Sequence, residues 1–450
     1  MVGIGGAGMA AIAHILLEMG VKVSGSDLQE NSATQQLAAA GAKVYIGHKA
    51  EQIGTAEVVV VSTAIAPDNP EVLSAQAAGI AVWHRSQMLA EIMNRRYGIA
   101  VAGAHGKTTT TSLLAWVLHH AGRNPTFLIG GEVVGLGGAQ YGTGQEVVAE
   151  ADESDRSFLR YQPAVAVVTG IEADHLEHYH GDFNYLVDTF AQFLKNIKPQ
   201  GTAVLYRGDP HLRRIGDALE RRVIWYGDAE ESEYVYSNVR SQGFNTHFTV
   251  LERGQALADF SLSIPGRHNI LNALAVIAVC RGLGMDSREI QPHLATFKGA
   301  RRRFEVIADV DGVLIVDDYA HHPSEVSAAI AGARAGWPKR RVIAVFQPHR
   351  YTRTHFLMDD FARCFAAAHH VVLTDVYSPP PDEYIQGATG ERLAELTRKY
   401  SHHLPVDYIP ARQDIAAHLK EICQPGDIVL TMGAGDIWRT SRELAGLLRA

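Results

Sequence analysis

Residues 103–108, with the sequence GAHGKT, constrain the fold of this chain more than any other feature. They follow the apolar run 99–102 and precede a segment with helical periodicity. A glycine-rich loop between a strand and a helix presents backbone N–H groups to phosphates, and its lysine and hydroxyl residue reach the β/γ-phosphates and Mg²⁺. Residue 101, where the usual motif has its first glycine, is a valine, so the loop is short. The segment predicts a phosphate-binding loop formed by Gly103, Ala104, His105, Gly106, Lys107, Thr108 and Thr109.

Short runs of valine and isoleucine alternate with helical segments along nearly the whole chain. Such continuous apolar runs are typical of parallel strands buried on both faces. A chain of 450 residues has room for about three domains. We therefore expect three α/β domains, over residues 1–92, 93–301 and 302–450, with an antiparallel edge between about 225 and 265. The runs expected as strands are 58–61, 99–102, 165–169, 313–316, 342–346, 371–374 and 428–431.

The composition excludes several classes of protein. With 41 Lys and Arg against 49 Asp and Glu, the net charge is −8, which argues against a nucleic-acid-binding protein. No apolar run reaches the roughly 18 residues of a membrane span, and no secretory signal is visible. Three cysteines without a C-x-x-C pair argue against a disulfide framework and a structural zinc site. We expect a cytoplasmic protein with neither nucleic acid nor membrane as a partner.

The N-terminus carries a second glycine-rich motif, GIGGAG, at residues 3–8. It opens a helix expected over residues 9–19, and Asp27 ends the following strand. Such glycines let the backbone approach a pyrophosphate at a helix N-terminus, and the carboxylate can accept a hydrogen bond from a sugar hydroxyl. NAD is the default ligand, and a turn that only packs helix on strand is the alternative. Only two residues precede Gly3, so the first strand is either rudimentary or clipped.

Acidic residues follow two further strands. Glu150 opens the stretch EADESD, directly after the strand that begins at Glu146, and His175 closes the stretch TGIEADH after the strand 165–169. Carboxylates one strand along from a phosphate-binding loop hold metals or orient water, which favours Glu150 as a Mg²⁺ ligand. A solvated acidic helix start is the alternative. His175 suits a metal site or a phosphate contact.

The remaining candidates lie on a helix and at strand ends in the last two blocks. Asn269 and Asn272 are three residues apart, so both amides can meet one ligand. The arginines at 301–303 form either a solvated hinge or a charge clamp on a phosphate. In the third block, the strand ends at 317–323 and 347–353 carry Tyr, His and Arg side chains, and Arg350 and Arg353 can bind a carboxylate.

From Gly3 to about residue 440 the chain resembles the Mur ligases, the ATP-dependent amide-forming enzymes of peptidoglycan assembly. The resemblance rests on GIGGAGM, SGSD, GAHGKTTT, EADESD, IEADH, GRHNILNA, RRRFE, DDYAHHPSE and FQPHRYTRT. It implies an N-terminal Rossmann-like domain for a UDP-sugar, a central P-loop ATPase domain and a C-terminal Rossmann-like domain for the amino acid. It also reassigns the first glycine loop from a dinucleotide to the UDP diphosphate.

The resemblance implies ATP, UDP-N-acetylmuramate and L-alanine as substrates, an acyl-phosphate intermediate and Mg²⁺ as cofactor. The implied UDP-sugar residues are Gly5, Gly6, Ala7, Gly8, Met9, Asp27, Ser62 and Thr63. Besides the phosphate-binding loop, the implied ATP residues are Asn269, Asn272, Arg303 and Asp318; the metal ligands are Thr108, Glu150 and His175. The implied L-alanine residues are Tyr319, His321, His349, Arg350 and Arg353, and the catalytic set is Lys107, Glu150, His175, Arg303 and Asp318.

Three alternatives stay open. The first is a murein-tripeptide-recycling ligase of the same family, which shares the architecture. The residues of the motifs GIGGAGM and DDYAHHPSE favour an enzyme that adds alanine. A nicotinamide-dependent dehydrogenase would use the N-terminal glycine loop and Asp27, and a nucleotide-switch protein would bind without catalysis. The chain has no lysine between Thr108 and Lys195, so the carbamylated lysine of sister ligases is not expected. Lys107 is expected on a solvent-facing loop, where its replacement leaves the fold intact.

Overall fold

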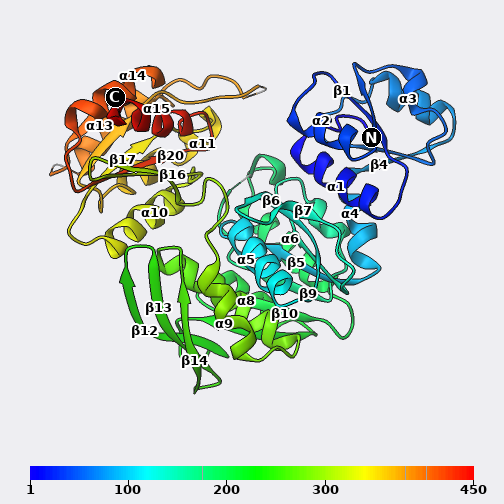
Figure 1. Ribbon diagram of the computed structural model, residues 1–450, viewed down its shortest axis with the longest axis horizontal. Coiled ribbons are helices and arrows are strands. Elements are labelled where there is room, and N and C mark those ends of the chain that lie inside the picture. The colour runs from blue at the N-terminus through cyan, green and yellow to red at the C-terminus, as the bar shows by residue number, and fades with distance from the viewer. Residues whose placement is uncertain (175, 381, 402, 450) are drawn as a thin grey trace. The chain divides into compact units, whose positions relative to one another are not determined.

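The computed structural model describes residues 1–174, 176–380, 382–401 and 403–449 (Figure 1). The chain forms two compact units. The first comprises Met1–Ser237, Val250–Ala258 and Leu271–Leu294, and the second comprises Asn238–Thr249, Asp259–Ile270 and Ala295–Ala450.

The N-terminal part of the first unit alternates strands and helices. Strands β1 and β2 pair in parallel, as do β3 and β4. Val2 lies between the two pairs, because it bridges Ser26 of β1 and its N–H donates to the carbonyl of Val60 in β3 at 2.9 Å. Residues 1 and 2 therefore act as a rudimentary central strand. The elements are α1 (Ala7–Glu18), β1 (Ser24–Asp27), α2 (Ser32–Ala39), β2 (Lys43–Ile46), η1 (Ala50–Ile53), β3 (Val58–Val61), α3 (Pro70–Ala77), β4 (Ala81–His84) and α4 (Arg85–Asn94).

The middle of the chain contributes a ten-stranded sheet with the order β14-β13-β12-β11-β10-β9-β5-β8-β6-β7. Strand β5 pairs in parallel with both β9 and β8, so residues that follow these three strands meet at one edge. The elements are β5 (Tyr97–Ala102), α5 (Lys107–His120), β6 (Thr126–Val133), β7 (Gly137–Gln140), β8 (Glu146–Glu150), η2 (Ser157–Arg160), β9 (Val165–Val168), η3 (Leu176–Tyr179), α6 (Phe183–Lys195), β10 (Thr202–Tyr206), α7 (Pro210–Asp217), β11 (Arg222–Gly227), β12 (Tyr234–Gln242), β13 (Asn245–Glu252), β14 (Gln255–Leu262), α8 (Arg267–Gly282) and α9 (Ser287–Thr296).

Strands β12, β13 and β14 form the edge expected between about 225 and 265. Only two residues, Gly243 and Phe244, connect β12 to β13. Adjacent strands joined by so short a connection run antiparallel, because a parallel pair needs a long crossover.

The C-terminal sheet of the second unit has the order β15-β16-β20-β17-β18-β19. Only β15 pairs antiparallel, at the edge. Strand β20 lies between β16 and β17, so the two polar strand ends expected from the sequence flank a third strand. The elements are β15 (Glu305–Val310), β16 (Val313–Asp318), α10 (Pro323–Gly336), β17 (Arg341–Phe346), α11 (Tyr351–Phe356), α12 (Met358–Arg363), β18 (His370–Leu373), α13 (Gly390–Tyr400), β19 (Val406–Tyr408), α14 (Arg412–Ile422), β20 (Asp427–Met432) and α15 (Trp438–Arg449).

Helices cover both faces of this sheet, as the continuous apolar strands predict. In β17, Val342, Ala344 and Phe346 belong to one apolar cluster, whereas Ile343 and Val345 belong to another. Each apolar run expected as a strand lies within an observed strand or extends one residue beyond it, so the α/β class is confirmed. Within the described part of the chain, no helix has the length and apolar character needed to cross a membrane.

Candidate active site

The phosphate-binding loop connects β5 to α5 and depends on two glycines with positive φ. Gly103 has φ +126° and Gly106 has φ +80°, a region that other residues rarely adopt. A Cβ atom at Gly103 would lie 2.3 Å from Oγ1 of Thr169, so a side chain cannot be accommodated there. The N–H of Ala104 also donates to the carbonyl of Gly170 at 2.9 Å. The loop is thus held against the segment that follows β9.

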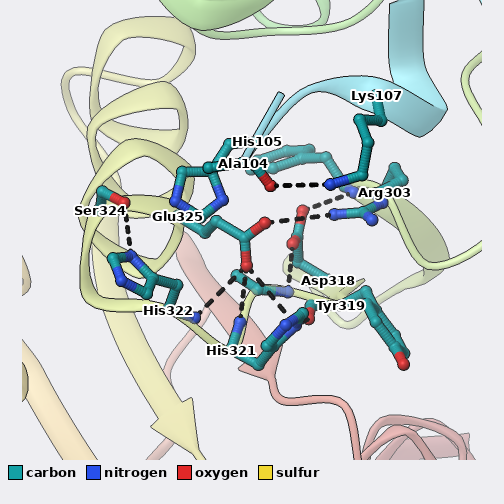
Figure 2. Close-up of polar contacts among 12 residues, drawn as sticks. Ala104, His105, Lys107, Arg303, Asp318, Tyr319, His321, His322, Ser324 and Glu325 are labelled. Carbon is teal, nitrogen blue, oxygen red and sulfur yellow. Dashed lines mark hydrogen bonds and ion pairs between the residues drawn. The ribbon is translucent and has the colours of Figure 1, made fainter. Parts of the chain in front are cut away.

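Lys107 is folded back onto this loop. Its Nζ donates to the carbonyl oxygens of Gly103 at 2.6 Å and Ala104 at 3.3 Å, and to Oε1 of Glu153 at 2.8 Å (Figure 2 shows the Ala104 contact). Only 18% of its side chain is exposed. Burial, the largest influence, lowers the pKa of Lys107, but the nearby carboxylates of Glu153, Asp152 and Glu150 raise it above the ordinary value. The expectation of a solvent-facing lysine is wrong, because the ammonium pairs with a buried acid.

Glu153 is a residue that the sequence interpretation missed. It is 3% exposed, and its Oε2 has no hydrogen-bond partner among the described residues. The phenolic O–H of buried Tyr179 donates to its backbone carbonyl. Within EADESD, spacing from the strand favoured Glu150, and only the approach of Lys107 distinguishes Glu153 from its acidic neighbours.

Glu150 and Thr108 approach two adjacent glycines of β6, Glu150 at Gly130 and Thr108 at Gly131. Oε1 of Glu150 accepts a hydrogen bond from the N–H of Gly130 at 2.7 Å. A Cβ atom at Gly130 would lie 2.6 Å from Oε2 of Glu150, and one at Gly131 would lie 3.3 Å from Cγ2 of Thr108. Glu150 contributes a carboxylate here, and Thr108, whose methyl Cγ2 is the atom nearest to Gly131, carries a hydroxyl; both are oxygen ligands of the kind that Mg²⁺ binds. The residues present therefore fit this cation.

The segment after β9 also lies beside the phosphate-binding loop. Nε2 of His105 is 3.2 Å from Oε2 of Glu172, and the Thr169 hydroxyl donates to the carbonyl of His105. The N–H of Ile171 donates to Oδ2 of Asp209 at 2.6 Å. His175, expected in this segment as a metal ligand, lies outside the described residues.

Three of the other expected ATP residues lie on two helices. Thr109 is in the first turn of α5. Oδ1 of Asn272 would lie 2.6 Å from a Cβ atom at Gly106, so α8 packs directly against the loop. Nδ2 of Asn269 donates to the carbonyl of Pro265 at 2.6 Å, close to the start of the same helix. That both amides contact one ligand stays a prediction.

The expected UDP-sugar residues gather beside the strands β1 and β3. Gly5 donates its N–H to Oδ2 of Asp27 at 2.8 Å, so the carboxylate supports the glycine loop. Ser62 and Thr63 follow β3, and the neighbouring Ile65 would contact a Cβ atom at Gly3 at 3.1 Å. Gly6 is the N-cap of α1, which contains Ala7, Gly8 and Met9.

In the second unit, Asp318 ends β16 and holds two backbone groups. Its Oδ1 accepts from the N–H of Ala320 at 2.7 Å, and its Oδ2 accepts from the N–H of Phe304 at 2.8 Å. Burial, opposed by the guanidinium of Arg303, raises the pKa of Asp318 to about 6. Arg303 lies 3.8 Å from Glu325, which accepts from the N–H groups before α10 (Figure 2).

We expect the pH dependence of stability to change in Asp318→Asn. Because folding raises the pKa from 3.8 to about 6, the folded protein binds this proton more tightly than the unfolded chain. Stability from this group is therefore complete at low pH and is lost as the pH rises through about 6. The melting temperature of the wild type should fall relative to that of Asp318→Asn between pH 5 and pH 7 in calorimetric scans. Parallel curves would contradict a raised pKa.

The residues expected to bind L-alanine lie together in the second unit. The rings of His321 and His349 are 6.3 Å apart, Nη1 of Arg353 is 3.5 Å from Nδ1 of His349, and the ring of Tyr319 lies 5.3 Å from the Arg303 guanidinium. Burial first, and then the cations Arg353, His321 and Arg350, lower the pKa of His349 to about 4. The neutral imidazole thus lies among positive charges that suit a carboxylate.

Two residues near this cluster were missed in the sequence. Tyr377 stacks on His349 with ring centroids 5.9 Å apart, and its carbonyl accepts from the N–H of Arg350 at 2.9 Å. Asp382 accepts from the N–H of Tyr351 at 2.7 Å and from the hydroxyl of Thr352 at 3.0 Å, so it caps α11. Neither belongs to a recognisable motif.

Comparisons with known proteins identify the class. Three family models match: "Mur ligase family, catalytic domain" over residues 1–97, "Mur ligase middle domain" over 101–280 and "Mur ligase, glutamate ligase domain" over 302–435. The chain belongs to the Mur ligase family, as the sequence resemblance predicts, and is an ATP-dependent ligase of cell-wall synthesis.

Individual relatives indicate which member of the Mur ligase family this chain resembles. The chain is 46% identical over 448 residues to the UDP-N-acetylmuramate–L-alanine ligase of Pelobacter propionicus, covering 99% of this chain and 97% of the relative. It is 28% identical to the structure of UDP-N-acetylmuramate-alanine ligase from Thermotoga maritima, with a TM-score of 0.81 and coverage of 100% and 98%. The structure of a murein peptide ligase from Psychrobacter arcticus is 26% identical with a TM-score of 0.67, covering 99% and 98%.

Proposed function

We propose that this protein joins L-alanine to UDP-N-acetylmuramate in peptidoglycan precursor synthesis, with ATP converted to ADP and phosphate. The observation that carries the proposal is the 46% identity, over nearly the whole of both chains, to a ligase named for these substrates. Two features of the structure support the proposal. The phosphate-binding loop suits the phosphates of ATP, and the cationic cluster around His349 suits the carboxylate of L-alanine. We also propose that the reaction takes place in the cytoplasm, where ATP is available.

ATP is needed because a carboxylate is a poor electrophile. The carboxylate of UDP-N-acetylmuramate attacks the γ-phosphorus of ATP, ADP leaves, and an acyl phosphate forms. Two anions meet in this step, so positive charge near the γ-phosphate lowers its barrier. We assign this role to Lys107, whose ammonium can exchange its contacts with Gly103 and Ala104 for phosphate oxygens.

The second step forms the amide. The neutral amine of L-alanine attacks the acyl carbon, the nitrogen loses a proton, and the tetrahedral intermediate collapses with release of phosphate. We assign Arg350 and Arg353 to the alanine carboxylate, with Tyr319, His321 and His349 around them. We further assign Arg303 and Asp318 to the nucleotide, together with Asn269 and Asn272.

We propose Thr108, Glu150 and His175 as the residues that hold Mg²⁺, which when bound offsets the charge of the phosphate oxygens. The position of Glu150 at the end of β8, next to the strand β5 that leads into the phosphate-binding loop, supports this assignment. Glu150 presents Oε1 and Oε2 close to Gly130, and Thr108 lies against Gly131. The UDP-sugar is assigned to residues 5–9 with Asp27, Ser62 and Thr63.

Glu150→Gln is expected to raise the Mg²⁺ concentration for half-maximal activity by roughly tenfold or more, because a hard-cation site loses an anionic ligand. Initial rates over a Mg²⁺ series measure this. Glu51→Gln makes the same chemical change at an exposed position of η1 and serves as the control. An unchanged Mg²⁺ dependence in Glu150→Gln would move the metal role to Asp152 or Glu153.

Phosphate release with each candidate acceptor tests the proposed reaction. With ATP, Mg²⁺ and UDP-N-acetylmuramate present, L-alanine should stimulate release, and the product should contain one alanine by mass spectrometry. Stimulation by a murein tripeptide but not by L-alanine would favour the tripeptide ligase instead. In thermal-shift measurements, UDP-N-acetylmuramate and ATP with Mg²⁺ should stabilise the protein, and NAD should not.

A further inference from the structure

The second unit contains a cavity of about 670 Å³, and none of the residues assigned above lines it. One wall is the two-residue connection between β12 and β13 with its flanking residues, and the other is the segment from the end of α10 to the start of β17. Among the described residues, no acidic side chain lines it. The polar side chains in its wall are Gln242, Asn245, His247, Lys339 and Arg340.

Two glycines hold the walls together. The N–H of Gly243 donates to the carbonyl of Gly336 at 2.7 Å. A Cβ atom at Gly336 would lie 2.5 Å from the Gly243 carbonyl oxygen, and Gly243 has φ +58°. Such a close backbone approach fixes the spacing of the walls, so the cavity is a built feature of the fold.

Arg340 is the unusual residue of this cavity. Its side chain is half-buried, and its Nη1 is buried without a hydrogen-bond partner within the part of the chain that the structure describes. Its backbone N–H donates to the carbonyl of Trp337 at 3.0 Å, which anchors it in the turn before β17. Buried polar groups are nearly always hydrogen-bonded, and a guanidinium carries five donors. The orphaned Nη1 therefore points to a missing acceptor.

Further donors accompany Arg340. The indole of Trp337 is stacked on Phe304 with ring centroids 6.1 Å apart and an interplanar angle of 10°, and Phe244 meets it edge-on at 4.6 Å. Its Nε1 would lie 3.8 Å from a Cβ atom at Gly243. Lys339 adds an exposed ammonium beside it. On a chain of net charge −8, this is a local concentration of positive charge and hydrogen-bond donors.

We propose that this cavity binds a small phosphate, either the inorganic ion or the phosphoryl group of a phosphate ester. The planar guanidinium of Arg340 can present two parallel N–H groups to two phosphate oxygens. The N–H of Trp337 and the ammonium of Lys339 bind further oxygens, and the two full positive charges match a phosphate dianion. The site is independent of the ligase assignment, because it uses none of the residues given to ATP, UDP-N-acetylmuramate or L-alanine.

Calorimetric titration with inorganic phosphate tests the site in the full-length protein. The phosphate-binding loop is expected to bind phosphate as well. The titration therefore compares the number of phosphate sites per chain between variants. Arg340→Met should lose one phosphate site, whereas Arg392→Met, at an exposed arginine of α13 that pairs with Glu395, should keep it. An equal number of sites in Arg340→Met and the wild type would overturn the proposal. If Arg340→Met does not fold, Trp337→Phe removes the indole N–H and should weaken the same site severalfold.

Three further measurements identify the ligand. Crystals soaked in tungstate, a phosphate mimic, should give an anomalous peak beside Arg340, and the absence of a peak there would contradict the site. AMP distinguishes the two sources of phosphate: binding of AMP at the Arg340-dependent site supports a phosphate ester, and binding of inorganic phosphate alone supports the free ion. Acetate binding as tight as that of phosphate would overturn the assignment to phosphate.

Discussion

Lys107→Ala is expected to lower kcat/KM for ligation by roughly 10²- to 10³-fold or more, the usual loss when one charge-stabilising donor is removed from a transition state. In the proposed reaction, Lys107 offsets the charge of the γ-phosphate as the carboxylate attacks it. The effect is measured as ATP-dependent phosphate release in the presence of both UDP-N-acetylmuramate and L-alanine. Turnover within a few fold of the wild type would contradict the assignment of Lys107 to ATP.

The same change is expected to destabilise the protein, unlike an ordinary loop substitution. Lys107 pairs with Glu153 at 2.8 Å, and the side chain of Glu153 is only 4% exposed. Removing the ammonium leaves a buried carboxylate without its counter-charge, which costs on the order of 3 kcal/mol. The free energy of unfolding in urea should fall accordingly, and an unchanged value would show that the pair contributes nothing.

A double variant separates the two effects of Lys107. In Lys107→Met with Glu153→Gln, the buried charge and its partner are both removed, so stability should return most of the way to that of the wild type. Activity should stay as low as in the single variant, because the ammonium assigned to the γ-phosphate is still missing. Recovery of activity in the double variant would mean that the single substitution acted only through misfolding.

The strands and the phosphate-binding loop could be predicted because their signals are local. A buried parallel strand shows itself as a run such as Val165–Val168, and the loop shows itself by two glycines before a lysine and a threonine. Both patterns follow from backbone geometry within a few residues. The Mur ligase resemblance then supplied the substrates, which periodicity and spacing alone could not name.

The order of the strands and the partners of the site residues are not local. Strand β20 inserts between β16 and β17 although it comes after both in sequence. Glu153 lies in a row of similar acids, and only the fold brings it to Lys107, 46 positions away. Tyr377 approaches His349 by the same kind of long-range pairing.

The contacts of Asp27 in the structure differ from those that the N-terminal glycine motif predicts. The spacing from the glycine loop predicted a carboxylate that accepts from a sugar hydroxyl. In the structure its Oδ2 accepts from the N–H of Gly5, and its Oδ1 is 3.5 Å from the backbone nitrogen of Gln29. The carboxylate thus orders the loop, and its contact with the UDP-sugar stays a prediction.

Arg350→Lys is expected to raise the KM for L-alanine about tenfold or more while leaving the KM for ATP within about twofold. A charge-assisted hydrogen bond to a carboxylate contributes roughly 1.5–3 kcal/mol, and a lysine ammonium cannot reproduce the two parallel N–H groups of a guanidinium. The supporting observation is the cluster around His349, where burial first, and then the nearby cations Arg353, His321 and Arg350, lower the pKa of the imidazole to about 4. That neutral ring leaves the arginines as the cations available to the amino-acid carboxylate.

Arg350→Lys tests the guanidinium alone, because the substitution keeps a positive charge and a long side chain at this position. Arg350 has φ +68° and precedes α11, and its N–H donates to Tyr377, but lysine meets the same backbone demands as arginine. The effect should therefore appear in KM for L-alanine and not in stability. Arg392→Lys, on the exposed face of α13, provides the matched control and should change neither KM. An equal rise in both KM values would assign Arg350 to the nucleotide. A residue that contacts only the amino acid should leave the binding of ATP unchanged.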